Sequence, residues 1–161
     1  MAVKEKFALY DNIFRDYIKV GTIFPKKDNK YLIARADYNQ NAIISYIDIK
    51  ENEVNSLPIK YNVQNRIKIA KQLINEPYGW GGMLNNRDCS SFTKDFFTPF
   101  GKYLNRNSKA QTKNGQYLDM SEFTKEQKKQ FLMEKGVPFS TLVYLRGHIM
   151  LYVGVKDNEP L

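Results

Sequence analysis

The segment 78–92 constrains this chain more than any other part of its sequence. It opens with the densest glycine cluster, at residues 78–82, and it contains the only tryptophan, Trp80, and the only cysteine, Cys89. Closely spaced glycines are typical of a loop, and the polar residues around Cys89 are typical of the start of a helix. We therefore expect a glycine-rich loop that leads into a helix, running to about Phe97, with a thiol in its first turn.

The only histidine, His148, lies in the apolar run 147–152, which predicts a strand. A thiol in the first turn of a helix is stabilised as the thiolate by the positive end of the helix dipole. A neighbouring imidazole can take its proton and return it to a leaving amine. Cys89 and His148 are thus candidates for a nucleophile and its base. The alternative is a small buried cysteine and a hydrogen-bonded core histidine, and residue types alone leave both interpretations open.

The remaining sequence predicts strands at both ends and helices between them. Short apolar runs predict strands in the first 60 residues, where a turn signal at 39–41 separates two of them. Apolar residues at helical spacing then predict a helix that Pro77 ends, and Thr124 with Gln127 fits a capping box for a later helix. The predicted segments are strands at 7–10, 14–20, 31–36 and 42–47, helices at 63–74, 89–97, 109–113 and 125–135, and strands at 140–145 and 148–155.

Composition restricts the function classes. The chain has 161 residues, an ordinary hydrophobic content of 42%, and no apolar run long enough to span a membrane. One cysteine excludes an internal disulfide and a four-thiolate metal site, and with one histidine we expect no metal site. The net charge of +8 favours polyanionic partners. Because the lysines are scattered and no nucleic-acid motif is present, we expect a solvated basic surface and no nucleic-acid binding.

Four separate motifs resemble the NlpC (p-sixty) family of cell-wall cysteine peptidases, in their order and spacing as well as in their residues. They are Glu76–Gly82, Arg87–Ser91, Arg106–Ser108 and Gly147–Gly154. The resemblance implies an α+β fold with a papain-like peptidase domain over residues 61–161. Residues 1–60 resemble the small all-β SH3-like barrel that precedes the catalytic domain in many members.

The resemblance also implies a reaction and the residues that perform it. Members hydrolyse γ-D-glutamyl bonds to diaminopimelate or lysine in peptidoglycan stem peptides, without a cofactor. By resemblance Cys89 is the nucleophile and His148 the general base, and Tyr78 is placed like the tyrosine beside the oxyanion site. The residues expected to contact the substrate are Tyr78 and Trp80, Asp88 and Ser90 at the amine of the N-terminal L-alanine, and Arg106 and Ser108 at the γ-D-glutamate subsites.

One part of the family pattern is missing from the sequence. Members carry a third polar residue, usually histidine, on the strand after the one with the base, where it orients the imidazole. We expect that position a few residues past Leu161. The prediction is therefore that the final strands are missing, that the strand following Asp157 and Asn158 does not form, and that activity is reduced. The unpaired sheet edge would invite pairing with a partner chain.

Two further expectations follow from the resemblance. The alternative to a peptidase is a truncated, weakly active or inactive module that binds cell-wall peptides. In either case we expect the protein in the cell envelope, periplasmic or secreted, with peptidoglycan stem peptides as its partners. Because its first residues contain no apolar signal region, we expect no signal peptide within this sequence.

Overall fold

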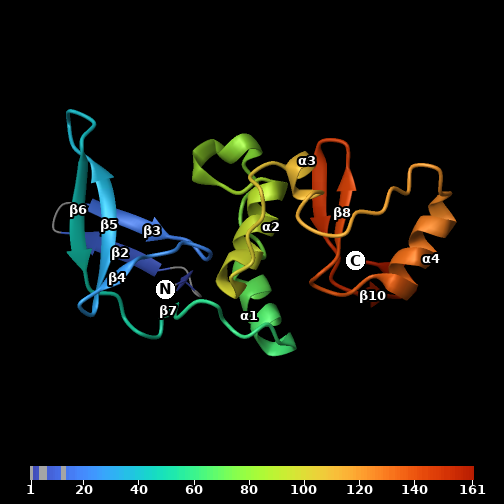
Figure 1. Cartoon of the computed structure of the whole chain (residues 1–161), viewed down its shortest axis with the longest axis horizontal. Helices are drawn as coiled ribbons and strands as arrows, with labels where there is room; N and C mark the ends of the chain where they lie inside the picture. The colour runs from blue at the N-terminus through green and yellow to red at the C-terminus, as the bar shows by residue number, and fades with distance from the viewer. Residues whose placement is uncertain (1, 4–6, 12–13) are drawn as a thin grey trace. The chain divides into compact units, whose positions relative to one another are not determined.

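A computed structural model describes residues 2–3, 7–11 and 14–161, which divide into two compact units. The first comprises Met1–Asn75 and Asp95–Lys102, and the second comprises Glu76–Lys94 and Tyr103–Leu161. The helix that carries Cys89 contributes residues to both. The mixture of helices and antiparallel strands agrees with the predicted α+β fold (Figure 1).

The strands at the start of the chain form antiparallel pairs in the first unit. A hairpin of β2 and β3, a three-stranded sheet in the order β4-β5-β6, and a short β1–β7 pair make up this part. Their bounds are β1 Ala2–Val3, β2 Phe7–Asp11, β3 Phe14–Ile18, β4 Lys26–Lys27, β5 Lys30–Ala36, β6 Ala42–Ile47 and β7 Val54–Asn55. The all-β start of the chain is thus as predicted, while the SH3-like barrel itself stays a prediction.

The β5–β6 hairpin shows how the sequence sets this sheet. Its turn is closed by Asp37, whose carboxylate accepts hydrogen bonds of 2.8 Å from the backbone N–H groups of Asn39 and Asn41. Alternation along β5 then buries Tyr31 and Ile33. They join a small hydrophobic core whose buried members are Phe24, Tyr31, Ile33, Ile49 and Val54.

Two helices begin where sequence signals place them. α1 (Val63–Leu73) is capped by Asn62, whose side chain accepts a 2.8 Å hydrogen bond from Asn65 N–H. α2 (Cys89–Phe97) has the predicted bounds and continues into the short 3-10 helix η2 (Thr98–Phe100). In the first unit, the end of α2 and η2 supply Phe96, Phe97 and Phe100, which pack with Tyr61 as an aromatic cluster.

The second unit contains the remaining helices and strands. Their bounds are η1 Trp80–Asn85, α3 Ser108–Gln111, α4 Lys125–Lys135, β8 Leu142–Leu145, β9 His148–Leu151, β10 Val155–Lys156 and β11 Glu159–Pro160. The predicted capping box at α4 is present, with Thr124 and Gln127 each bonding the other's backbone. β8 and β9 form an antiparallel hairpin whose turn contains Gly147 at φ 85°.

The prediction for the C-terminal strand is wrong, because the segment after Asp157 and Asn158 does pair. These two residues have φ values of 52° and 61°, which form a tight left-handed turn and return the chain onto β10 as β11. Glu159 therefore lies in a strand and not in the turn, and its carboxylate forms an ion pair with Lys129 of α4. No helix in the described ranges is long and apolar enough to cross a membrane.

Candidate active site

Cys89 is the first residue of α2, and its side chain is half-buried. The Tyr78 hydroxyl lies beside Cys89, close enough for the backbone N–H and the thiol of Cys89 to influence its pKa. Loss of solvation raises the pKa of Tyr78, and the negative charges of Cys89 and Asp88 raise it further. Tyr78 therefore stays protonated at neutral pH and holds a hydroxyl proton beside the sulfur. The structure places Tyr78 next to Cys89, and its role beside an oxyanion stays a prediction.

A short parallel bridge brings Tyr78 to this position. It pairs Tyr78 with Arg87, and the Gly79 N–H donates to the Arg87 carbonyl at 2.9 Å. The chain between them must therefore fold back tightly. A Cβ at Gly79 would lie 2.4 Å from the Met83 carbonyl oxygen, so only glycine fits there. The loop holds Trp80 at the surface, 76% exposed, which is compatible with the predicted contact with a substrate.

Asp88 caps the helix that carries the nucleophile candidate. Its carboxylate accepts a 2.7 Å hydrogen bond from Ser91 N–H, and its own N–H donates to Ser91 Oγ at 2.8 Å. The Ser90 hydroxyl also donates to the carboxylate, at 3.0 Å. Cys89 is thereby fixed at the first position of a doubly capped helix, where the backbone N–H groups are free of helical partners.

Arg106, from another segment of the chain, binds the same Asp88 carboxylate. Its two terminal nitrogens donate to the two oxygens of Asp88, at 3.1 and 2.9 Å, and one also donates to Ser90 Oγ at 3.0 Å. Burial by itself raises the pKa of Asp88, but the hydrogen bonds from Arg106, Ser91 and Ser90 outweigh it and lower that pKa to about 2. Asp88 is therefore an anion at all physiological pH values.

Three of the predicted substrate-binding residues are thus brought together and bonded to one another: Asp88, Ser90 and Arg106. Ser108 lies two residues beyond Arg106, as the first residue of α3, and is half-buried. The N-terminus of α3 is capped by Asn107, whose side chain accepts a 2.9 Å hydrogen bond from Ala110 N–H. The motif 106–108 therefore contains both the residue that forms an ion pair with the cap of α2 and the first residue of α3.

Sequence analysis missed two buried polar contacts that support this arrangement. Arg87, which precedes the cap, is 6% exposed and forms an ion pair with Glu76. Gln111 of α3 is 2% exposed, and its side-chain amide bonds the first turn of α2. The patterns gave no sign of either role, since a glutamine or an arginine among polar neighbours is typical of a solvated surface.

His148 is the first residue of β9, and its side chain is exposed. His148 belongs to the same unit as Cys89. β9 packs against α3, and the segment just before α3 binds the start of α2. The hydrogen bonds of the described residues do not include one between the Cys89 thiol and the His148 ring. The dyad therefore stays a prediction, with both members carried by elements that α3 connects.

Comparison with known proteins decides the family. The model of the NlpC/P60 family matches residues 75–158, which is just over half of the chain. The chain belongs to the NlpC/P60 family. It is also similar to the solved structure of an NlpC/P60 endopeptidase from Photobacterium damselae subsp. piscicida, with a TM-score of 0.82 and 28% sequence identity. The match covers 99% of this chain and 39% of that one. No curated protein matches the chain.

The family match spans all the predicted site residues, from Tyr78 to His148. The NlpC/P60 model and the similar endopeptidase together support a peptidase role and an α+β papain-like fold for this chain. Within the described ranges, no group of three or more histidine, cysteine, aspartate or glutamate side chains is arranged to hold a metal ion.

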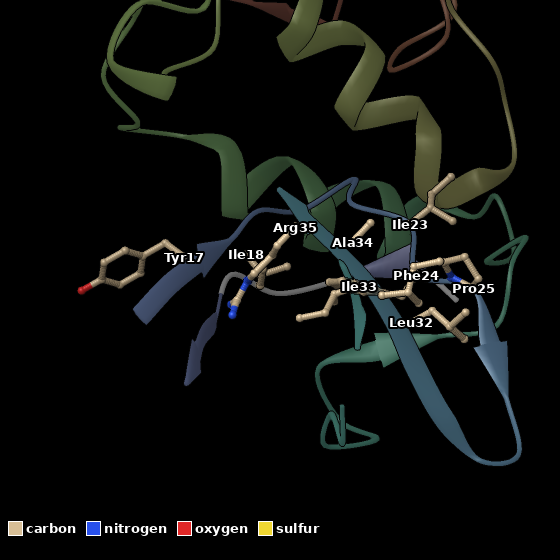
Figure 2. A pocket seen from close by; sticks show the side chains of 10 residues that line it. Tyr17, Ile18, Ile23, Phe24, Pro25, Leu32, Ile33, Ala34 and Arg35 are labelled. Atoms are coloured by element: carbon tan, nitrogen blue, oxygen red, sulfur yellow. The ribbon is translucent and has the colours of Figure 1, made fainter. Parts of the chain in front are cut away.

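A separate apolar hollow of about 600 Å³ lies in the first unit. Figure 2 shows Tyr17 at one end of it and Phe24, Pro25 and Leu32 at the other. Its lining contains no cysteine, histidine or carboxylate, so it offers no group for the peptidase chemistry. The lining residues are Tyr17, Ile18, Ile23, Phe24, Pro25, Leu32, Ile33, Ala34, Arg35 and Ile44.

Proposed function

We propose that this chain is a cysteine endopeptidase that hydrolyses γ-D-glutamyl bonds to diaminopimelate or lysine in peptidoglycan stem peptides. Cys89 is the nucleophile and His148 the general base. The observation that carries the proposal is the local structure at Cys89: a thiol at the first residue of a helix capped by Asp88, with the Tyr78 hydroxyl beside it. Membership of the NlpC/P60 family supplies the reaction class.

The reaction proceeds through a thioester. The Cys89 sulfur attacks the γ-carbonyl carbon of D-glutamate, while His148 takes the thiol proton and passes it to the departing amine as the C–N bond breaks. Water then attacks the thioester with His148 as base, which releases the acid and restores the thiol. In both steps a negative oxygen forms on the carbonyl. The Cys89 N–H and the protonated Tyr78 hydroxyl are donors beside the sulfur that can stabilise it.

The groups around Asp88 suit the N-terminal end of such a peptide. The anionic carboxylate accepts one hydrogen bond from Arg106 at Oδ2 and keeps a second lone pair on that oxygen, which can accept an ammonium group. The half-exposed guanidinium of Arg106 and the hydroxyl of Ser108 are donors for the α-carboxylate of D-glutamate. Trp80, on the exposed loop, offers an apolar face to the peptide.

The test is incubation with the tripeptide L-Ala-γ-D-Glu-diaminopimelate and product analysis by mass. The expected result is release of diaminopimelate and L-Ala-D-Glu, lost in Cys89→Ala. Asp119→Asn serves as a matched control, and this variant should cleave the tripeptide normally. Asp119 is exposed, and its carboxylate accepts a hydrogen bond from the backbone N–H of nearby Ser121. Cleavage that persists in Cys89→Ala contradicts the proposal. Binding of the tripeptide without cleavage supports the alternative, a module that holds cell-wall peptides.

The same proposal implies a cellular location and a domain organisation for the chain. A peptidoglycan substrate requires access to the cell envelope, so we propose a periplasmic or secreted location. The strands of the first unit are compatible with an SH3-like barrel over residues 1–60, followed by the peptidase domain over 61–161. Immunodetection in periplasmic and cytoplasmic fractions tests the location, with recovery only from the cytoplasm as the contrary result.

A further inference from the structure

Gln111 is a polar side chain placed under the first turn of the nucleophile helix. It is 2% exposed and makes three short hydrogen bonds. Its amide nitrogen donates to the Ser90 carbonyl at 2.8 Å and to the Asn105 carbonyl at 2.9 Å, and its amide oxygen accepts from Thr93 Oγ1 at 2.7 Å. Both the nitrogen and the oxygen of the Gln111 amide therefore have a hydrogen-bond partner on α2, the helix that begins at Cys89.

These hydrogen bonds restrict the orientation of α2 relative to α3 as well as holding the two helices in contact. An apolar side chain of the same size would fill the space at a lower desolvation cost, but it would allow α2 to rotate or slide along it. The amide of Gln111 contacts a carbonyl one residue after Cys89 and a hydroxyl one helical turn after it. Thr93 is itself 1% exposed, so the pair forms a buried polar connection between two helices.

The segment that carries Gln111 also reaches the strand of the proposed base. α3 packs against β9, whose first residue is His148. The same segment is joined to the helix cap by the paired bonds from Arg106 to Asp88. A change in the Gln111 contacts would therefore move α2 relative to the structure that supports His148, without touching either reacting group.

We propose that Gln111 is a positioning residue, which sets the place of the Cys89 thiol relative to His148 through its bonds to Ser90 and Thr93. The inference rests on the proposed Cys89–His148 dyad. It assigns to a buried glutamine of the 105–111 segment an effect on thiol reactivity that is separate from its effect on folding.

The test uses the fact that the chain contains one cysteine. The rate of alkylation by iodoacetamide, followed by mass between pH 5 and pH 10, reports on Cys89 alone. Gln111→Met keeps the volume and removes the bonds, and Thr93→Val removes the bond from the other side. Thr124→Ala is the matched control, because it removes a helix cap in the same unit, at α4, and so lowers thermal stability without touching α2.

We expect the pH profile of alkylation to move in Gln111→Met and in Thr93→Val and to stay unchanged in Thr124→Ala. With the tripeptide substrate, kcat should fall by about tenfold or more while KM stays within about twofold, since misplacing a reacting group acts on the transition state. Thr93→Ser, which keeps the hydroxyl, should lose less than Thr93→Val. Equal profiles in all variants, or losses that follow thermal stability alone, overturn the inference.

The outcomes separate this inference from the proposed function. If the wild-type chain cleaves the tripeptide and the Gln111 and Thr93 variants keep its alkylation profile, the positioning role is wrong and the peptidase stands. If the wild-type chain does not cleave but the profiles move, the glutamine positions the thiol and the proposed reaction is wrong.

Discussion

Replacing Asp88 with asparagine removes one charge and leaves the helix cap in place. Asparagine caps helices about as well as aspartate, so the change removes the charge that pairs with Arg106 while the Ser91 N–H can still be capped. The lowering of the Asp88 pKa from 3.8 to about 2 corresponds to at most about 2.5 kcal/mol of stability at neutral pH, at 1.36 kcal/mol per pH unit. Because the Arg106 side chain is 50% exposed, solvent screening reduces this, and we expect Asp88→Asn to lose about 1 to 2 kcal/mol at pH 7.

The sign of the pH dependence follows from the direction of the shift. A carboxyl whose pKa is lower in the folded state stabilises the fold above its unfolded pKa, near 3.8, and loses this contribution as pH falls toward about 2. Nearly half of the contribution should be gone at pH 3, since that pH lies midway in the window. The difference in unfolding free energy between wild type and Asp88→Asn should therefore shrink from pH 7 to pH 3.

Urea unfolding followed by circular dichroism at pH 7, 5, 4 and 3 measures this difference. Asp119→Asn is the control: backbone and side-chain hydrogen bonds from Ser121, and to a lesser degree the charge of Lys128, lower the pKa of Asp119 too, but Asp119 is exposed and its carboxylate bonds the backbone N–H of a residue two positions away. A difference for Asp88→Asn that stays constant from pH 7 to pH 3 would refute the account of the Arg106–Asp88 pair.

Three further tests, two of them with a matched control substitution, address an ion pair, the glycine loop and the proposed base. Arg87→Met removes the buried cation of the Arg87–Glu76 ion pair and should cost about 3 kcal/mol in urea unfolding. Lys129→Met, from a more exposed ion pair, should cost below about 1 kcal/mol. Gly79→Ala places a Cβ 2.4 Å from a carbonyl oxygen and should abolish cleavage. In Gly82→Ala the new Cβ meets only a side-chain nitrogen at 3.9 Å, so the change should cost about 1 to 2 kcal/mol of unfolding free energy through its φ of 93°. Equal losses of cleavage in the two variants would contradict the loop geometry. His148→Gln should lower kcat by about 10² to 10⁴ without lowering thermal stability, and an unchanged kcat would exclude it as the base.

Local signals predicted the elements that carry the site. The bounds of α2 were correct because its start and end depend on residues next to it: polar groups around Cys89, and Pro99 and Gly101 beyond Phe97. The capping box at Thr124 was correct for the same reason. The strands of the first unit followed from short alternating runs with turn residues between them.

Contacts between distant residues were beyond such signals. Nothing near Gln111 indicates that its amide is buried against Ser90, 21 positions earlier. Arg106 was expected beside a substrate, and its bonds to Asp88 depend on how α2 and the 105–111 segment pack. The strand β11 was missed because two left-handed residues in succession, Asp157 and Asn158, allow a turn tight enough to pair two-residue strands.

The most direct test of the account is an acid-quenched single turnover with the tripeptide, followed by digestion and mass analysis. The account predicts an L-Ala-γ-D-glutamyl group attached to the peptide that contains Cys89, since this residue is the only cysteine and forms the thioester. The adduct should be absent in Cys89→Ala and should accumulate more slowly in His148→Gln. Release of diaminopimelate with no acyl group on Cys89 at any time point, or in the Cys89→Ala protein, would contradict the central claim.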